Sequence, residues 1–145
     1  GRGMQGFGLL LLRIVLGLTF LAHGLPKLFP LWGTSPQITA ALFEAASFTP
    51  AYPLAVGTGI VEVLAGLLLI VGAYTFWACA LLVATTSVIA WKLHVPHGFF
   101  VNWSLTPETG HGYEFAFVLT GALVCLMCSG PGSCSIDRRR TVKRR

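Results

Sequence analysis

The stretch from Leu9 to Phe29, LLLLRIVLGLTFLAHGLPKLF, decides how the rest of the chain can fold. It is long enough to cross a bilayer, because about 20 apolar residues suffice for a transmembrane helix. Three ionisable residues, Arg13, His23 and Lys27, nevertheless lie within it. Charged groups are costly at membrane depth and usually face protein or water there. We therefore expect one side of this helix to be turned inward.

The spacing of the residues identifies that inward side. Steps of three and four residues place side chains on one helix face, and here they connect Arg13, Gly17, Phe20, Gly24 and Lys27. The two glycines would let a second helix approach closely. Pro26 lacks a backbone N–H, so we expect a kink at this end of the helix.

The composition is that of an integral membrane protein. Of the 145 residues, 54% are hydrophobic and only 10% are charged, whereas soluble domains contain about 25% charged residues. We expect an all-α fold, with one four-helix transmembrane bundle over residues 1–135. The first apolar run is too long for a signal peptide and no small-residue cleavage site follows it. The predicted helices cover approximately residues 6–29, 50–71, 75–95 and 112–128.

Two further segments lie outside the predicted spans. Ser35 and Pro36 resemble an N-cap and a first helical residue, and they start a short amphipathic helix that we expect on the membrane surface. Residues 136–145 contain six Lys or Arg and one acid. This basic tail predicts an inner-membrane, multi-pass protein with both termini in the cytoplasm. We favour a membrane-surface anchor over nucleic-acid binding for so short a tail, so the expected partners are the lipid bilayer and no nucleic acid.

A carboxylate lies in the middle of the second predicted span. Glu62 shares a helix face with Gly59 and Gly66, so we expect it to point into the bundle. A buried carboxylate needs a partner or a proton. Arg13 is at a comparable depth in the antiparallel first helix, and we therefore predict a buried Glu62–Arg13 pair. Its role could be catalytic, or it could only fix the register of the helices.

Polar residues also collect at the outer ends of the predicted helices. They include His23, His94 and Glu114, which predict a polar pocket that opens outward above the charged pair. Histidine and carboxylate groups can move protons near neutral pH, which suits a small polar or quinone-like ligand. The alternative is an ordinary interfacial rim, and we favour it for His97, His111 and Lys92.

Metal and thiol chemistry are less well supported. His94 and His97 are separated by Pro96, which interrupts the helix, so we predict no metal site. Cys125 and Cys128 match a redox motif in letters only, because they lie in an apolar helical run. We expect the cysteines to behave as buried small hydrophobes. No motif for a covalently attached cofactor is present.

Five segments together resemble the DoxX family from Leu9 to Asp137. They are RIVLGLTFLAHGLPKLF, the glycine-flanked Glu62, HVPHGFF, GYEFAFVLTGA and GPGSCSID. The family is similar to the membrane subunit of thiosulfate:quinone oxidoreductases and to membrane partners of sulfur-transfer and redox-defence proteins. By this resemblance, the family's motif positions are matched by Arg13, His23, Gly24, Lys27, Glu62, His94, Phe99, Phe100, Asn102 and Glu114. From the convergence of ionisable residues we predict catalytic roles in proton or charge transfer for Arg13, His23, Glu62, His94 and Glu114, and ligand-binding roles for Lys27, His97, Phe99, Phe100 and Asn102.

Three functions therefore remain open at the level of the sequence. The first is a membrane subunit linked to quinone or sulfur redox chemistry, with a quinone as its non-covalent ligand and other protein subunits as partners. The second is a non-catalytic structural or assembly subunit, which would present Trp77, Trp91, Trp103 and Phe117 to a partner. The third is a small-solute permease, although no inverted repeat supports it.

Overall fold

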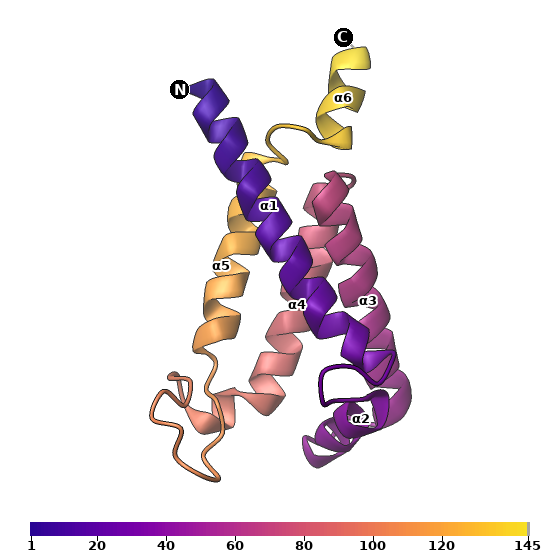
Figure 1. Ribbon diagram of the computed structural model, residues 1–145, viewed down its shortest axis with the longest axis vertical. Coiled ribbons are helices and arrows are strands. Elements are labelled where there is room, and N and C mark those ends of the chain that lie inside the picture. Colours follow the sequence, from indigo (N-terminus) through magenta and orange to yellow (C-terminus); the bar gives the residue numbers. More distant parts are fainter. Residues whose placement is uncertain (145) are drawn as a thin grey trace.

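The computed structural model describes residues 1–144, and within this range the chain is helical and contains no strand. The all-α prediction is therefore confirmed. Four longer helices lie side by side, both termini lie at one end, and α2 crosses the opposite end (Figure 1). The elements are α1 (Arg2–Gly24), the 3₁₀ turn η1 (Leu25–Lys27), α2 (Pro36–Ala45), α3 (Ala51–Val71), α4 (Thr75–Leu93), the 3₁₀ turn η2 (Val95–His97), α5 (Glu114–Ser129) and α6 (Ile136–Lys143).

Three helical segments of the described chain are long and apolar enough to cross a membrane. They are Arg2–Lys27, Ala51–Val71 and Thr75–Leu93. Helix α5 is also apolar but has only 16 residues, which gives it a length of about 24 Å at 1.5 Å per residue. The other three helices are long enough to span a membrane. The prediction that α5 is a fourth span is not tested by its length.

Both short helices begin at a serine cap. The Ser35 hydroxyl accepts a hydrogen bond from the Ile38 N–H at 3.2 Å, and Pro36 occupies the first turn of α2. The predicted helix therefore exists, and its place on the membrane surface stays a prediction. The Ser135 hydroxyl likewise accepts from the Arg138 N–H at 3.2 Å and starts α6. The basic tail thus contains a helix that the sequence analysis did not predict.

Glycines bring the backbones of α1 and α3 into contact, as the spacing predicted. A Cβ atom on Gly24 would lie 2.9 Å from the Gly59 carbonyl oxygen. A Cβ atom on Gly66 would lie 2.9 Å from the Gly17 carbonyl oxygen. Since no side chain separates the helices at these points, any larger residue must push them apart. The tight α1–α3 pair fixes the position of every side chain that projects from either helix beside it.

A matched pair of substitutions in α3 tests this contact. Gly59→Ala would place a Cβ 2.7 Å from Lys27 Cβ, whereas Gly57→Ala enters open space. We expect Gly59→Ala to destabilise the protein by about 1–3 kcal/mol through overpacking. Gly57→Ala should be neutral or slightly stabilising, because alanine favours a helix by about 1 kcal/mol over glycine. Thermal unfolding of both variants in detergent measures the difference, and equal losses would contradict the contact.

Arg13 is fully buried, with 0% of its surface exposed, at the end of the bundle that carries the termini. Its Nη1 donates to the Pro131 carbonyl at 2.8 Å. Its Nη2 donates to the carbonyls of Cys134 at 3.1 Å and Ser133 at 3.3 Å. The guanidinium therefore binds the segment that follows α5, and backbone oxygens provide the negative ends of its hydrogen bonds.

The predicted Glu62–Arg13 pair is wrong. Glu62 is bound by Lys27, with 2.9 Å between Nζ and Oε2. Arg13 lies 14 residues before Lys27 in the chain, or about 20 Å along a continuous helix. Because α1 and α3 are antiparallel, Glu62 lies beside Gly24 and Arg13 lies beside Gly72 at the far end of α3. Comparable depth in two separate helices did not establish which residues meet.

Asp137 completes this end of the bundle, which we call the Arg13 clasp (Arg13, Gly72 and residues 131–137). Gly72 ends α3 with φ of +68°, and a Cβ there would collide with the Arg13 guanidinium. The Asp137 N–H donates to the Gly72 carbonyl at 2.9 Å. Its carboxylate accepts from the N–H groups of Tyr74 at 2.8 Å and Thr75 at 2.9 Å, which caps α4. The clasp therefore joins α1, α3, α4 and the segment after α5.

Arg13→Lys should open the clasp while it keeps the positive charge. A lysine ammonium is a compact donor without the planar fork that reaches separate carbonyls, so we expect a loss of about 2–3 kcal/mol. Arg2→Lys, at an exposed position of the same helix, is the control and should change stability by less than about 0.5 kcal/mol. Unfolding titrations in mixed micelles measure both. Equal stability of the two variants would show that the carbonyl contacts contribute nothing.

Candidate functional site

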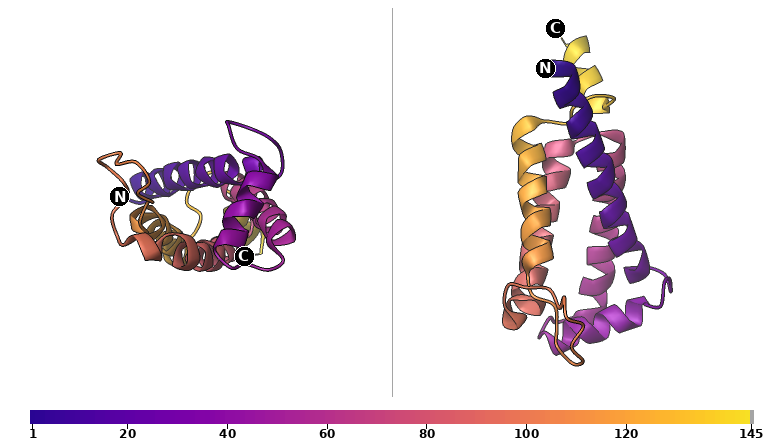
Figure 2. Two further views of the ribbon diagram at one scale, coloured as in Figure 1. Left: turned by 90° about the horizontal axis from the view of Figure 1, so that it is seen from below. Right: turned by 60° about the vertical axis from the view of Figure 1, so that its left-hand side comes forward.

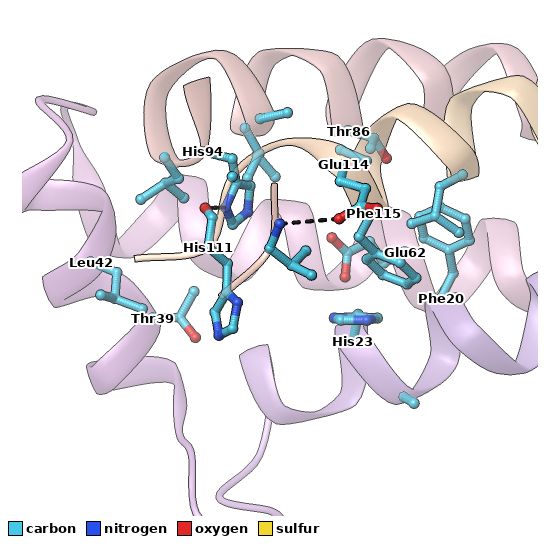
Figure 3. A pocket seen from close by; sticks show the side chains of 18 of the residues that line it. Phe20, His23, Thr39, Leu42, Glu62, Thr86, His94, His111, Glu114 and Phe115 are labelled. Atoms are coloured by element: carbon cyan, nitrogen blue, oxygen red, sulfur yellow. Dashed lines mark hydrogen bonds between the residues drawn. The ribbon is translucent and has the colours of Figure 1, made fainter. Parts of the chain in front are cut away.

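A cavity of about 1010 Å³ lies at the end of the bundle opposite the clasp. Helices α1, α4 and α5 form its walls, α2 and the loop after η2 border its outer end, and α3 contributes Glu62 (Figure 3). This volume is at the upper end of the range of about 300–1,000 Å³ found for ligand pockets. All four histidines of the chain line the cavity. The other polar and charged residues that line it are Lys27, Trp32, Thr34, Thr39, Glu62, Thr86, Trp103 and Glu114.

The Lys27–Glu62 ion pair is the innermost charged group of the cavity. Lys27 Nζ lies 2.9 Å from Oε2 and 3.2 Å from Oε1 of Glu62, so the contact is bidentate. Nζ also donates to the His23 carbonyl at 3.0 Å. The side chains are only 16% and 8% exposed. A charge pair this well shielded depends on its hydrogen bonds to offset the loss of hydration.

Local backbone structure explains why Lys27 reaches Glu62. Pro26 cannot continue the α-helical hydrogen bonding, and α1 passes into the 3₁₀ turn η1 at Leu25–Lys27. The last carbonyls of a helix have no partner within it, which leaves the His23 carbonyl free to accept from Lys27. The stem of Lys27 then packs against the bare backbone of Gly59. The expected interruption at Pro26 is therefore present and has a direct role in building the site.

Glu114 is fixed from the opposite wall. It is the first residue of α5, and its backbone N–H donates to the Phe99 carbonyl at 2.8 Å. Its Oε2 accepts from the Val101 N–H and from the Trp103 indole N–H, both at 3.1 Å. A carboxylate is also stabilised at a helix N-terminus. Glu114 therefore holds the outer loop against α5 and presents a negative charge to the cavity.

Hydrogen bonds assign a proton position to two of the histidines. His94 Nδ1 lies 3.1 Å from the His111 carbonyl oxygen, which can only accept, so Nδ1 carries the proton. His111 Nδ1 accepts from the Asn102 N–H at 2.9 Å, so in the neutral ring Nε2 carries the proton. The two rings thus offer different groups to a ligand: in its neutral form His94 retains an acceptor nitrogen and His111 a donor.

Six of the predicted site residues line this one cavity: His23, Lys27, Glu62, His94, His97 and Glu114. Their catalytic and ligand-binding roles stay predictions. Arg13 belongs to the clasp at the far end and is not part of the cavity. His111, which we expected to be only a rim residue, lines the cavity together with Trp103.

The remaining predicted ligand-binding residues organise the loop that borders the cavity and do not line it. Phe99 packs against the rings of Phe100 and Tyr113, with centroids 5.1 and 5.2 Å away. Asn102 Nδ2 donates to the carbonyls of Thr106 at 2.9 Å and Thr109 at 3.0 Å. Sequence spacing identified this loop but did not separate the residues that stabilise it from those that face the cavity.

Among residues 1–144, no cysteine lines the cavity and no cluster of metal ligands borders it. Only Cys79 is buried, while Cys125, Cys128 and Cys134 are exposed. The expectation of buried cysteines is therefore wrong for three of them, because the last turn of α5 and the segment after it leave these side chains on the surface. Within residues 1–144, no group of three His, Cys, Asp or Glu residues is placed to hold a metal ion.

A double-mutant cycle tests the Lys27–Glu62 pair. Removing one partner leaves a buried charge alone, so Lys27→Met and Glu62→Leu should each cost about 3–5 kcal/mol of unfolding free energy. The double variant should recover most of that loss, because two apolar side chains of similar size replace two charges. Unfolding titrations of all four proteins measure the coupling. Additive losses would mean that the two side chains do not interact in the membrane protein.

Comparison with known proteins provides the family of the chain. The sequence profile of the DoxX family matches residues 8–95, which include His23, Lys27, Glu62 and His94 but not Glu114. No curated protein and no solved structure matches the chain significantly. The matched segment contains the α1–α3 pair and most of the charged groups of the cavity. The chain therefore belongs to the DoxX family, and its long apolar helices make it a membrane protein.

Proposed function

We propose that this protein is a membrane subunit that binds a quinone in the cavity and exchanges protons with it during sulfur-linked redox chemistry. One observation carries the proposal: a single cavity at the end of apolar helices collects the buried Lys27–Glu62 pair, Glu114 and all four histidines. Ligand sites of this kind have mostly apolar walls and a few convergent polar groups.

The residues of the cavity suit the two parts of a quinone. Apolar side chains of Phe20, Phe115 and Leu119 line its walls and would contact the ring. The quinone oxygens accept hydrogen bonds, and the Lys27 ammonium and the rings of His23 and His111 can donate them. Figure 3 shows His23 and Glu62 on neighbouring sides of the same space. We therefore assign the inner part of the cavity to the quinone head.

Proton transfer is the chemistry that these side chains would perform. Reduction of a quinone to a quinol consumes two electrons and two protons. The electrons would come from a reduced sulfur donor: two thiosulfate ions that join through a sulfur–sulfur bond release two. The Lys27 ammonium, held by Glu62, and His23 would deliver protons near the ring, and His94, His97 and His111 would replace them from the aqueous side. Arg13, which we first assigned to this chemistry, has a structural role in the clasp.

The orientation of the protein follows from its charge. Five of the basic side chains of the tail lie in or directly after α6, at the end with both termini. The positive-inside tendency favours the cytoplasm for that end, so the cavity would open on the outer side of the inner membrane. A sulfur donor or a partner subunit would then approach from outside the cytoplasm.

Quinone binding can be measured through the tryptophans that line the cavity. In lipid nanodiscs, a benzoquinone with a decyl tail should quench the fluorescence of Trp32 and Trp103 as it binds. We expect Glu62→Gln and His94→Ala to weaken binding by about tenfold each, a loss of the size of one hydrogen bond. Glu62 positions the Lys27 ammonium that would donate to the quinone, and His94 holds the His111 segment of the lining. Glu44→Gln, at an exposed position of α2, is the matched control and should bind as the wild type does.

Folding must be verified separately, because Glu62→Gln also weakens the ion pair. Helical circular dichroism and a single gel-filtration peak serve that purpose, and His94→Ala tests the site without removing a buried charge. Quinone reduction with thiosulfate in membranes that contain the full complex is the functional readout. A wild-type protein that is folded in nanodiscs and binds no quinone would refute the proposal.

A structural or assembly role is the second candidate, and one observation favours it. Trp77, Trp91, Trp103 and Phe117 are all highly exposed, and aromatic residues are enriched where proteins meet partners. Purification in a gentle detergent separates the two functions. Two results together would favour the structural role. Other chains would co-purify in stoichiometric amounts, and the Glu62→Gln variant would bind the quinone as tightly as the wild type does.

A further inference from the structure

The wall of the cavity between α1 and α5 differs from its other walls. Near the termini these helices are held together through the segment after α5, since the Ser133 N–H donates to the Gly6 carbonyl at 3.0 Å. From there they diverge toward the cavity (Figure 2). At the level of the ion pair, the His23 and Phe115 ring centroids still approach to 6.0 Å across the space between the helices. The two helices are therefore farther apart beside the cavity than near the termini, and these two rings narrow the space between them.

Apart from His23, the side chains at this place are apolar. Ala22 of α1 and Val118 of α5 line the cavity, and both are exposed. Val118 is 62% exposed and Phe115 is 47% exposed. Because α1 and α5 diverge here, their exposed lining residues are placed to border a second mouth of the cavity. We call this place, formed by Ala22, His23, Phe115 and Val118, the side opening.

The position of the side opening along α1 and α5 favours contact with lipid over contact with water. Ala22 lies within the membrane-spanning segment Arg2–Lys27, and Val118 lies one turn inside the apolar helix α5. The other mouth is different, because its exposed lining residues include Trp32, Trp103 and His97 beside the outer loops. The cavity therefore has one mouth with polar and aromatic residues beside the outer loops, and a second mouth between α1 and α5 that is lined mainly by apolar residues.

We infer that the ligand of this cavity is a membrane-dissolved molecule with a long apolar chain, which enters between α1 and α5 and leaves its chain in the side opening. This inference rests on the proposed quinone site and adds the class of quinone and its route. The polar head would lie at the Lys27–Glu62 ion pair, which borders the apolar walls of the cavity. The chain would remain in contact with lipid, so it would lose no favourable environment on binding.

A tryptophan at Val118 tests the side opening directly. The larger ring would fill the opening, so a tailed ligand would have to confine its chain inside the cavity. The alkyl chain would then lose its contact with lipid on binding. We therefore expect a decyl benzoquinone to bind about tenfold more weakly in nanodiscs. The same benzoquinone without a tail enters from the aqueous mouth, and its affinity should change by less than about twofold. Val124→Trp is the matched control, because Val124 is an exposed valine of α5 that does not line the cavity.

A second measurement locates the chain without a change in the protein. A benzoquinone whose alkyl tail ends in a photoreactive diazirine should label peptides of α1 and α5 around the side opening. Labelling confined to α2 and the outer loop would place the chain in the aqueous mouth and would overturn the inference.

The outcomes separate the two proposals. If neither the tailed nor the tailless quinone binds the wild type, the proposed function fails. If both bind the wild type, and Val118→Trp weakens them equally or not at all, the quinone site survives and the side opening is refuted. Selective loss of the tailed ligand in Val118→Trp, with Val124→Trp unchanged, supports the inference.

Discussion

The contact between the bare backbones of α1 and α3 is the constraint on which the site depends. Gly24 and Gly59 leave no side chain between the helices, so the stem of Lys27 lies directly against α3 and its ammonium reaches Glu62. With an ordinary helix separation of about 8–10 Å, the same two charges would be harder to bring into bidentate contact. Close packing on one side of α1 also leaves its other side free to form the cavity wall.

The buried ionisable groups fall into two sets at opposite ends of the molecule. In the clasp, the Arg13 guanidinium donates to backbone carbonyls of the segment after α5, and a smaller cavity of about 380 Å³ adjoins this segment. At the other end, charges are paired but border a large open volume. Burial alone therefore does not indicate function in this membrane protein. What distinguishes the second set is that a ligand could approach it.

Much of this arrangement was accessible from the sequence, and the failures have definite causes. Apolar runs predicted α1, α3 and α4, Ser35-Pro36 predicted the start of α2, and glycine spacing predicted the inward faces. The partner of Glu62 was wrong, because the pattern within a helix says nothing about its register against another helix. The partners of Arg13 were not predicted, because they are backbone carbonyls, which every residue has and which no sequence pattern identifies. Helix α6 was not predicted, because residues 136–145 were interpreted by their charge and the N-cap at Ser135 was not considered.

The position of the clasp along the chain has a consequence for biosynthesis. Arg13 is near the beginning, whereas the carbonyls and the carboxylate that complete its surroundings lie at residues 131–137. Chains are made from the N-terminal end, so the first helix leaves the ribosome well before its guanidinium can find those acceptors. Until the last segment emerges, the nascent chain must keep this arginine hydrated or shielded by the insertion machinery. A polypeptide cut short before Pro131 would enter the bilayer with the Arg13 charge and without the carbonyls that bind it.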